Sequence, residues 1–303
     1  MKKWIALLLS VCLLLSVAGC KKVPEQNKDN GNNGSQPVTP NGSDPDNSTG
    51  TPTVKQLPMV SISLPTVTES VTAEDGTVIF EYTSQQAPYL IVPDPNVAEA
   101  VINDFLNRID STTLDKDAIQ SAAESAYNGN GSFTPYMYSI TYAPQRIDYG
   151  VLSLLGTDVR YTGGNHASSS GVSVSYDLIT GKVLTLGDIL MSSISADTIC
   201  QLVLNALSDL SAEITLYQGY EATVSDRFSG KLSENEAWYL SQTGLCFYFS
   251  PYEIAPYSAG VVVVEIPYEK LTGIMVDAYF PPERDTASGA VAAKIFDVDN
   301  LQD

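Results

Sequence analysis

The single histidine of this chain, His166, is the first residue to consider for chemistry. It follows Gly163 and Gly164 in a predicted loop, and three serines, 168–170, are near it in sequence. A histidine in such a loop can act as a general base or a metal ligand, or its ring can tie the loop to a backbone carbonyl. A hydrolase centred on His166 would need a nucleophile, yet no Gly-x-Ser-x-Gly or Ser-x-x-Lys motif occurs in the sequence. We therefore expect no catalytic residue and no enzyme, with a hydrolase as the less favoured alternative.

The cysteines offer little for a metal centre. There are four, Cys12, Cys20, Cys200 and Cys246, whereas zinc needs three or four ligands gathered in one place. One histidine with two widely separated cysteines does not meet that need, so we expect no metal and no cofactor. Cys200 lies on a predicted helix and Cys246 in a predicted strand, and outside the cell they can form a disulfide. The other interpretation is two small buried thiols. The distance between the two cysteines decides between a disulfide and free thiols, and the sequence does not give it.

Two prolines and two tyrosines stand within residues 251–257. Tyr252 and Tyr257 can serve as rigid amphipathic anchors for a protein or a sugar. Alternatively, the prolines fix a crossover between two strands and the tyrosine rings pack on the core. If this part of the chain binds a ligand, the predicted contact residues are His166, Tyr252, Glu253 and Tyr257.

The first twenty residues have the three parts of a bacterial export signal. Lys2 and Lys3 precede an apolar run, residues 4–17, which is too short for a stable membrane span. The run ends in Val17-Ala18-Gly19-Cys20, which resembles the lipobox of bacterial lipoproteins. The resemblance implies a lipoprotein signal peptide over residues 1–19 and diacylglycerol on Cys20. We therefore expect an extracellular protein that the lipid on Cys20 anchors to the outer face of the cell membrane.

Residues 20–58 are rich in Asn, Gly, Ser, Pro and Thr and contain almost no large apolar side chains. Such a segment cannot bury enough apolar surface to offset the entropy that ordering would cost. We expect the lipidated cysteine to continue into a disordered tether that ends at about residue 58.

Acidic side chains dominate the charge of the chain. The 303 residues include 16 Lys and Arg against 35 Asp and Glu, a net charge of −19. Residues 59–303 hold 10 basic and 31 acidic side chains, so an excess of −21 lies on the predicted folded body. This charge excludes nucleic acid as the main partner, because phosphate would be repelled. An acidic excess is common on soluble proteins, where it helps to keep them in solution, and it also favours attraction of cationic proteins.

The folded body mixes strands and helices without a regular alternation, which favours an α+β fold with mixed, mainly antiparallel sheets and packed helices. A hairpin is predicted from 60–68 and 77–82, and Asp94-Pro95 is typical of a helix start. Apolar spacing predicts that this first helix extends to Ile109, and it predicts two further helices over 118–127 and 199–210. Further strands are predicted at 89–92, 133–143, 151–161, 171–178, 183–186, 238–240, 245–249 and 261–266.

Two stretches of sequence resemble the RsiV-like extracellular domain. The first is Tyr161–His166 with Ser175–Leu190, and the second is Gly244–Gly260 with Ile266–Leu271. This family includes the ectodomain of the lysozyme-sensing anti-sigma-V factor, and it also occurs beside a peptidoglycan deacetylase domain. The resemblance implies an α+β fold at the Gram-positive envelope, with two small α+β subdomains, 59–160 and 161–285, and a tail at 286–303. In the sensor it implies direct lysozyme binding.

The sequence shows neither the sigma-binding region of that sensor nor a deacetylase domain, so we expect neither activity. We expect instead a lipid-anchored binding module of the cell envelope without catalysis. Its expected partner is lysozyme or another cationic wall-acting protein, and the alternative partner is peptidoglycan, with its glycan held by the tyrosines.

Overall fold

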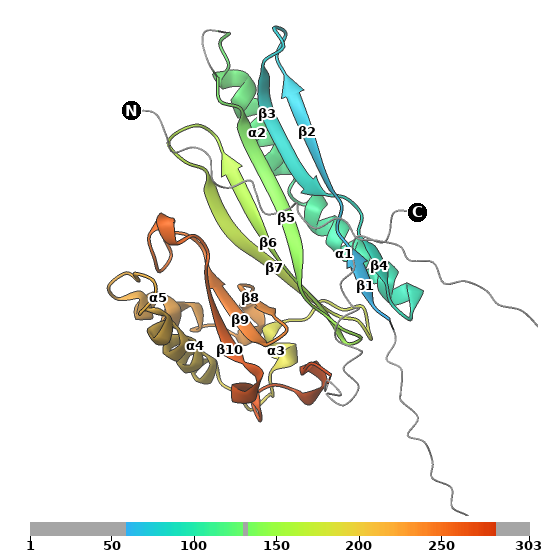
Figure 1. Ribbon diagram of the computed structural model, residues 1–303, viewed down its shortest axis with the longest axis vertical. Helices are drawn as coiled ribbons and strands as arrows, with labels where there is room; N and C mark the ends of the chain where they lie inside the picture. The colour runs from blue at the N-terminus through green and yellow to red at the C-terminus, as the bar shows by residue number, and fades with distance from the viewer. Residues whose placement is uncertain (1–58, 130–132, 283–303) are drawn as a thin grey trace, which may run out of the picture. The chain divides into compact units, whose positions relative to one another are not determined.

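The computed structural model describes residues 59–129 and 133–282 (Figure 1). The chain divides into two units, Met1–Val54 and Lys55–Asp303, and every described residue lies in the second. The expected signal peptide, Cys20, the tether and the tail therefore lie outside the described residues. Within 59–129 and 133–282, no helix combines the length and the apolar character that crossing a membrane requires.

A five-stranded sheet forms the first layer of the folded unit (Figure 1). Neighbouring strands are antiparallel except β3 and β5, which are parallel because a helical connection returns the chain to the same end of the sheet. In spatial order the strands are β2 (Thr66–Thr72), β3 (Val78–Gln85), β5 (Tyr136–Ile147), β6 (Val151–Tyr161) and β7 (Ser168–Asp177).

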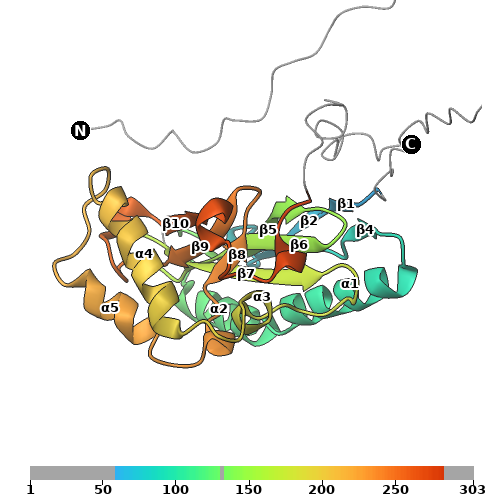
Figure 2. The same ribbon diagram turned by 90° about the horizontal axis from the view of Figure 1, so that it is seen from below.

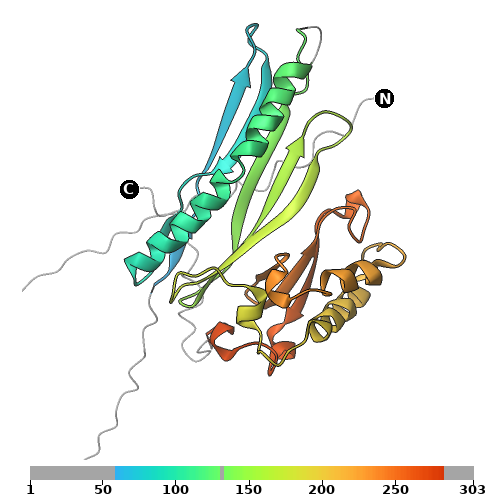
Figure 3. The same cartoon turned by 180° about the vertical axis from the view of Figure 1, so that it is seen from behind.

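Two helices, α1 (Pro95–Asp110) and α2 (Thr113–Ala126), form that connection and cover one face of the sheet (Figure 3). The Asp94 side chain accepts a hydrogen bond from the Asn96 amide at 2.9 Å and caps α1, as the sequence predicts. The beginning of α2 escaped prediction because its first turn is polar and its Leu114 is 81% exposed. A short ribbon, β1 (Ser61–Ser63) with β4 (Tyr89–Ile91), lies before α1 in sequence.

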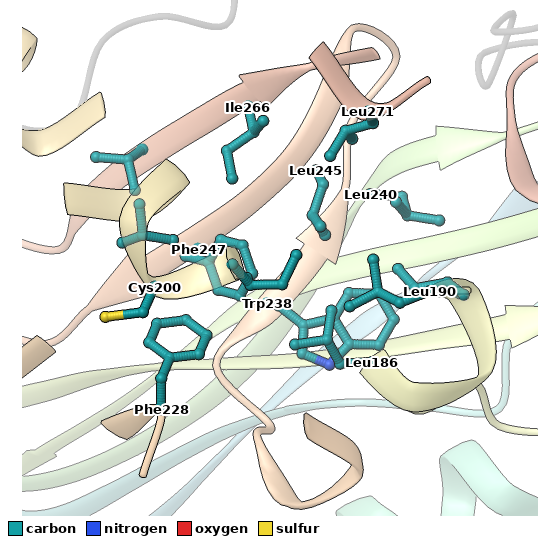
Figure 4. Close-up of a cluster of buried hydrophobic side chains, with 14 of the residues drawn as sticks. Leu186, Leu190, Cys200, Phe228, Trp238, Leu240, Leu245, Phe247, Ile266 and Leu271 are labelled. Atoms are coloured by element: carbon teal, nitrogen blue, oxygen red, sulfur yellow. The ribbon is translucent and has the colours of Figure 1, made fainter. Parts of the chain in front are cut away.

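A second layer contains an antiparallel sheet in the order β10 (Val262–Pro267), β9 (Gly244–Phe249) and β8 (Trp238–Leu240). Helices α4 (Ala196–Leu210) and α5 (Tyr220–Arg227) lie on its outer side (Figure 2). The core between them includes Phe228 of the loop after α5, Trp238 and Phe247 (Figure 4). The α+β prediction is confirmed.

Short helical turns complete this layer. α3 (Leu186–Ile189) begins where a strand over 183–186 was predicted, because Thr185 and Asp188 form a capping box that starts a helix. Val183 makes only an isolated bridge with Tyr176. The 3₁₀ turns are η1 (Leu232–Glu234), η2 (Tyr257–Ala259), η3 (Tyr268–Leu271) and η4 (Asp277–Tyr279).

The two sheets meet where β7 approaches β8 and β9. A Cβ atom on Gly171 would lie 2.5 Å from the Tyr248 ring, so this position requires the absence of a side chain. Ser173 Oγ donates to the Trp238 carbonyl at 2.6 Å, and the Leu240 amide donates to Ser153 Oγ at 2.9 Å. These bonds join the layers into one unit. The expected boundary between residues 160 and 161 falls at the hairpin of β6 and β7, within the first sheet.

A buried arginine ties the C-terminal part of the second layer to the first sheet. Arg146 of β5 is 1% exposed, and its Nε pairs with Asp148 Oδ2 at 2.7 Å. Its Nη1 donates to Tyr268 Oη at 2.9 Å and to the Tyr279 carbonyl at 2.6 Å. A buried charge is tolerated only when it is paired and hydrogen-bonded in this way.

Candidate functional site

Three predicted contact residues, His166, Tyr252 and Tyr257, come together in the structure, and we call them the aromatic cluster. His166 lies on the loop between β6 and β7, whereas the two tyrosines lie between β9 and β10. The His166 and Tyr257 rings stack with centroids 4.2 Å apart and planes at 25°. Tyr252 lies beside them, with its ring centroid 5.6 Å from that of Tyr257 and its hydroxyl 3.2 Å from His166 Nε2.

The loop that carries His166 depends on two glycines. Gly163 and Gly164 both adopt φ of +96°, a left-handed region that other residues rarely adopt. The Tyr161 hydroxyl donates to the Gly164 carbonyl at 3.1 Å and closes the loop on itself. The turn presents His166 toward the tyrosines, and Tyr257 Oη donates to the Ala167 carbonyl at 3.0 Å.

Tyr252 adopts an unusual backbone conformation. Its φ is +71°, and among the described residues other than glycine it alone has a positive φ. A bulky side chain in this region is strained, because its Cβ crowds the neighbouring backbone. The Tyr252 amide donates to the Ala255 carbonyl at 3.0 Å, which closes the turn that imposes the conformation. The residue is 56% exposed, so the strain is not offset by burial in a core.

The hydrogen bonds of His166 assign its tautomer. Nδ1 lies 3.1 Å from the Ala167 carbonyl, which can only accept, so Nδ1 carries the proton. In the neutral ring Nε2 then accepts from the Tyr252 hydroxyl. The nearby Ser168 Oγ donates its hydrogen bond to the Arg160 carbonyl and not to the His166 ring. The cluster is therefore an aromatic surface whose two tyrosine hydroxyls are held in place by bonds to His166 and to the Ala167 carbonyl, an arrangement suited to binding.

Comparisons with known proteins give part of the chain a family context. The DUF3298 family model, described as a protein of unknown function, matches residues 190–269. The chain carries a DUF3298 domain. A solved DUF3298 family member from Bacteroides fragilis has a TM-score of 0.51 and 19% identity, and covers 74% of this chain and 96% of that one. A DUF3298 family protein from Pseudomonas aeruginosa has a TM-score of 0.51 and 17% identity, and the match covers 74% of this chain and 98% of that one. No curated protein sequence matches the chain.

The aromatic cluster extends across the edge of the DUF3298 match. Tyr252 and Tyr257 lie inside residues 190–269, whereas His166 precedes that range, on the loop between β6 and β7. The likeness to the two solved DUF3298 proteins covers more of the chain than the matched range, and it shows the fold alone. The cluster thus depends on contact between the DUF3298 domain and the β6–β7 hairpin.

Glu253, the fourth predicted contact residue, lies next to Tyr252 but bonds elsewhere. Its carboxylate forms an ion pair with Arg227 at the end of α5 and accepts the Ser250 amide at 2.9 Å. Arg227 also donates to the Tyr248 carbonyl at 2.6 Å. Glu253 therefore holds the turn that carries Tyr252. The predicted elements did not include α5, because only Val224 of its residues is buried and no apolar stripe marks it.

Cys200 and Cys246 are both buried free thiols, so the disulfide interpretation does not hold in this structure. Cys200 of α4 belongs to the core between the helices and the second sheet (Figure 4). Cys246 of β9 packs on the other face of that sheet, with Tyr239 and Tyr248. Side chains alternate along a strand, so the Leu245 and Phe247 side chains face α4 and the Cys246 thiol faces away.

The Cys246 thiol is expected to resist alkylation in the folded DUF3298 domain. Burial raises its pKa to about 12, so the reactive thiolate is scarce at neutral pH. Iodoacetamide followed by peptide mapping should label Cys246 and Cys200 only after a denaturant is added. A Cys200–Cys246 cross-linked peptide, or rapid labelling of Cys246 without denaturant, would contradict this expectation.

Residues 59–129 and 133–282 contain no group of three or more His, Cys, Asp or Glu side chains arranged to hold a metal ion. Cys20, the predicted lipidation site, lies outside the described residues. The pairing of His166 with Tyr252 had no local signal, because 86 positions separate them.

Proposed function

We propose that this protein is a lipid-anchored binding module on the extracellular face of the cell membrane, and that the aromatic cluster is part of its contact surface. We further propose that its partner is a cationic wall-acting protein of lysozyme type, as the resemblance to RsiV-like domains implies. The gathering of His166, Tyr252 and Tyr257 from two distant segments is the observation that carries this proposal.

The backbone strain at Tyr252 supports a binding role for the cluster. A bulky residue in the left-handed region costs about 1–3 kcal/mol, and such strain is concentrated at functional sites. Tyr252 is largely exposed, so its ring contributes little to the core. Exposed tyrosines are among the residues that contribute most to protein interfaces, because a rigid ring and a hydroxyl bind with little loss of entropy.

The distribution of charge supports a cationic partner. Residues 59–282 carry 8 basic and 26 acidic side chains. Six of those basic residues already form ion pairs with acids of the same chain: Arg108, Lys116, Arg146, Arg160, Arg227 and Lys231. The basic groups are therefore largely neutralised, while most carboxylates in this part of the chain are not. Such a surface increases the rate at which cationic proteins associate, most of all at low salt.

The predicted anchor suits this role. A lipid on Cys20 would keep the protein at the membrane, where wall-acting proteins arrive. Repulsion between the acidic unit and anionic headgroups would keep it away from the bilayer surface.

Replacing Tyr252 with glycine tests the proposal. Glycine adopts φ of +71° without strain, so we expect the free energy of unfolding to change by less than about 1 kcal/mol. We expect lysozyme to bind the unaltered protein with micromolar or tighter affinity in calorimetric titration. Tyr252→Gly should weaken that binding by about thirtyfold, as the loss of an interface anchor does. The matched control is Tyr149→Ala, which removes an exposed tyrosine outside the cluster.

The salt dependence of binding separates the two candidate partners. Lysozyme binding should weaken steeply between low and high salt, because opposite charges drive it. A glycan partner, which the stacked rings of His166 and Tyr257 would also suit, predicts sedimentation with purified cell wall that persists in high salt. Absence of lysozyme binding at low ionic strength would overturn the protein partner, and wall binding that Tyr252→Gly abolishes would support the glycan.

A further inference from the structure

An open hollow lies on the connection between α4 and α5. Its volume is about 400 Å³, and its lining includes Glu213, Ile214, Leu216, Tyr217 and Tyr220. Ile214, Leu216 and Tyr220 pack against the core of the second layer, whereas Tyr217 is 39% exposed. The hollow therefore has a largely apolar floor, and a ligand can reach the Tyr217 ring from solvent.

The hollow lies beside the turn that carries Tyr252. The Tyr217 amide donates to the Ile254 carbonyl at 2.8 Å. Ile254 comes two residues after Tyr252, and two residues of extended chain span at most about 7 Å. A partner that covers the exposed Tyr252 of the aromatic cluster can therefore reach the hollow at the same time.

The charge around the hollow is negative. No basic residue occurs between Lys182 and Arg227, whereas this part of the chain contains several acidic ones, among them Glu213 and Glu221. Burial, and then the Glu221 charge, raise the pKa of Tyr220, so that carboxylate acts on the hollow as well. The ion pairs within residues 59–129 and 133–282 include neither Glu213 nor Glu221. The hollow thus attracts a cation and repels an anion.

Elsewhere in this protein, arginines are held by the same two components, an aromatic ring and a carboxylate. Arg146, Arg160 and Arg227 each pair with an acid and lie over a ring. Arg160, for example, pairs with Asp158 at 2.7 Å, and its Cζ lies 4.9 Å from the centroid of the Tyr138 ring. The hollow offers a ring and a carboxylate without a cation of this chain between them.

The composition of the hollow favours arginine over lysine. A guanidinium is planar, stacks on aromatic rings and offers several donors to one carboxylate. It is also more weakly hydrated than an ammonium, so it loses less when it leaves water for a hollow with an apolar floor. An arginine side chain therefore matches the Tyr217 ring, the Glu213 carboxylate and the floor together.

We propose that an arginine side chain of the cationic partner enters this hollow, where its guanidinium stacks on the Tyr217 ring and pairs with the Glu213 carboxylate. This inference rests on the proposed function, and it names the residue type by which the partner binds beside the aromatic cluster. A lysine side chain is the competing occupant.

Calorimetric titration with lysozyme at low salt tests the two contacts. Glu213→Gln removes the charge but keeps the shape, and Tyr217→Leu removes the ring but keeps an apolar side chain. Each should weaken binding by about fivefold. Tyr217→Phe keeps the ring and should bind like the unaltered protein. Glu99→Gln, at an exposed position of α1, removes the same charge from the first layer and should change the affinity by less than about twofold.

A small probe tests the hollow without lysozyme. Nα-acetylarginine amide should cause saturable changes in the backbone-amide NMR shifts of residues 213–220. Nα-acetylcitrulline amide has nearly the same shape without the charge and should cause none, and Nα-acetyllysine amide should bind more weakly than the arginine amide. Glu213→Gln should weaken the response to the arginine amide, and circular dichroism checks that each variant is folded.

The outcomes separate this site from the proposed function. Failure of lysozyme to bind the unaltered protein would contradict the proposed partner, whereas saturable binding of the arginine amide at residues 213–220 would still support the arginine site. Lysozyme binding that neither Glu213→Gln nor Tyr217→Leu weakens would overturn the arginine site alone. Absence of saturable shifts with the arginine amide, or equal binding of the lysine amide, would overturn it too.

Discussion

Arg146→Met is expected to lower the free energy of unfolding by about 3–5 kcal/mol, because it leaves the nearly buried Asp148 carboxylate without its cation. The same change removes the donors to Tyr268 Oη and to the Tyr279 carbonyl. These bonds hold the C-terminal part of the second layer on the first sheet. Urea denaturation followed by circular dichroism measures the loss.

A surface ion pair provides the control for Arg146. Lys231 pairs with Glu234 at 3.2 Å, but its side chain is 81% exposed, and Lys231→Met should cost less than about 1 kcal/mol. The double variant Arg146→Met with Asp148→Asn should be more stable than Arg146→Met alone, since no uncompensated charge stays buried. Equal losses for Arg146→Met and Lys231→Met would show that the buried Arg146 and its bonds do not stabilise the fold more than a surface ion pair does.

Gly171→Ala is expected to destabilise the protein by about 1–3 kcal/mol, the usual cost of overpacking a dense interior. The new methyl group would lie 2.5 Å from the Tyr248 ring, so β7 and β9 would have to separate or the ring would have to move. Because β9 leads directly into the turn that carries Tyr252, the same variant should also weaken binding at the aromatic cluster. Thermal unfolding and lysozyme titration measure the two effects.

Two further variants isolate the cause of the Gly171 effect. At Gly150, a Cβ atom would meet only Asp148 Oδ1, at an ordinary 3.5 Å, so Gly150→Ala should change stability little. Combining Gly171→Ala with Tyr248→Leu should cost less than the two single changes added together, because the smaller side chain makes room for the methyl group. Strict additivity would indicate that the two residues do not contact each other.

The regular elements could be predicted from sequence where their pattern is local. The apolar spacing and the Asp94 cap predicted α1, and the alternation after the 74–76 turn predicted β3. The predicted first strand of the hairpin, 60–68, was wrong: it joined β1, which pairs with β4, to the start of β2, which extends to Thr72. The prediction for β6 agrees with the observed Val151–Tyr161. These patterns are readable because a helix or a strand repeats its own geometry every few residues. The polar first turn of α2 and the whole of α5 lack such a pattern and were missed.

The candidate site depended on sequence and structure in different ways. Residue types made His166, Tyr252 and Tyr257 candidates, since aromatic rings near prolines and glycines suit an exposed contact surface. The contact between these residues could not be predicted from sequence. It requires packing to bring together two loops whose residues His166 and Tyr252 are 86 positions apart in the chain. Glu253 looked equivalent to its neighbours in sequence, yet the structure pairs it with Arg227.

The sequence by itself determined the charge of this protein and most of its strands and helices, because these properties depend on composition and on short-range periodicity. Only the tertiary structure decided that Cys200 and Cys246 lie on opposite sides of a sheet, and that His166 meets Tyr252 and Tyr257. Those outcomes depend on which faces of distant elements pack together. Packing is a property of the whole fold, so no local window of sequence contains it.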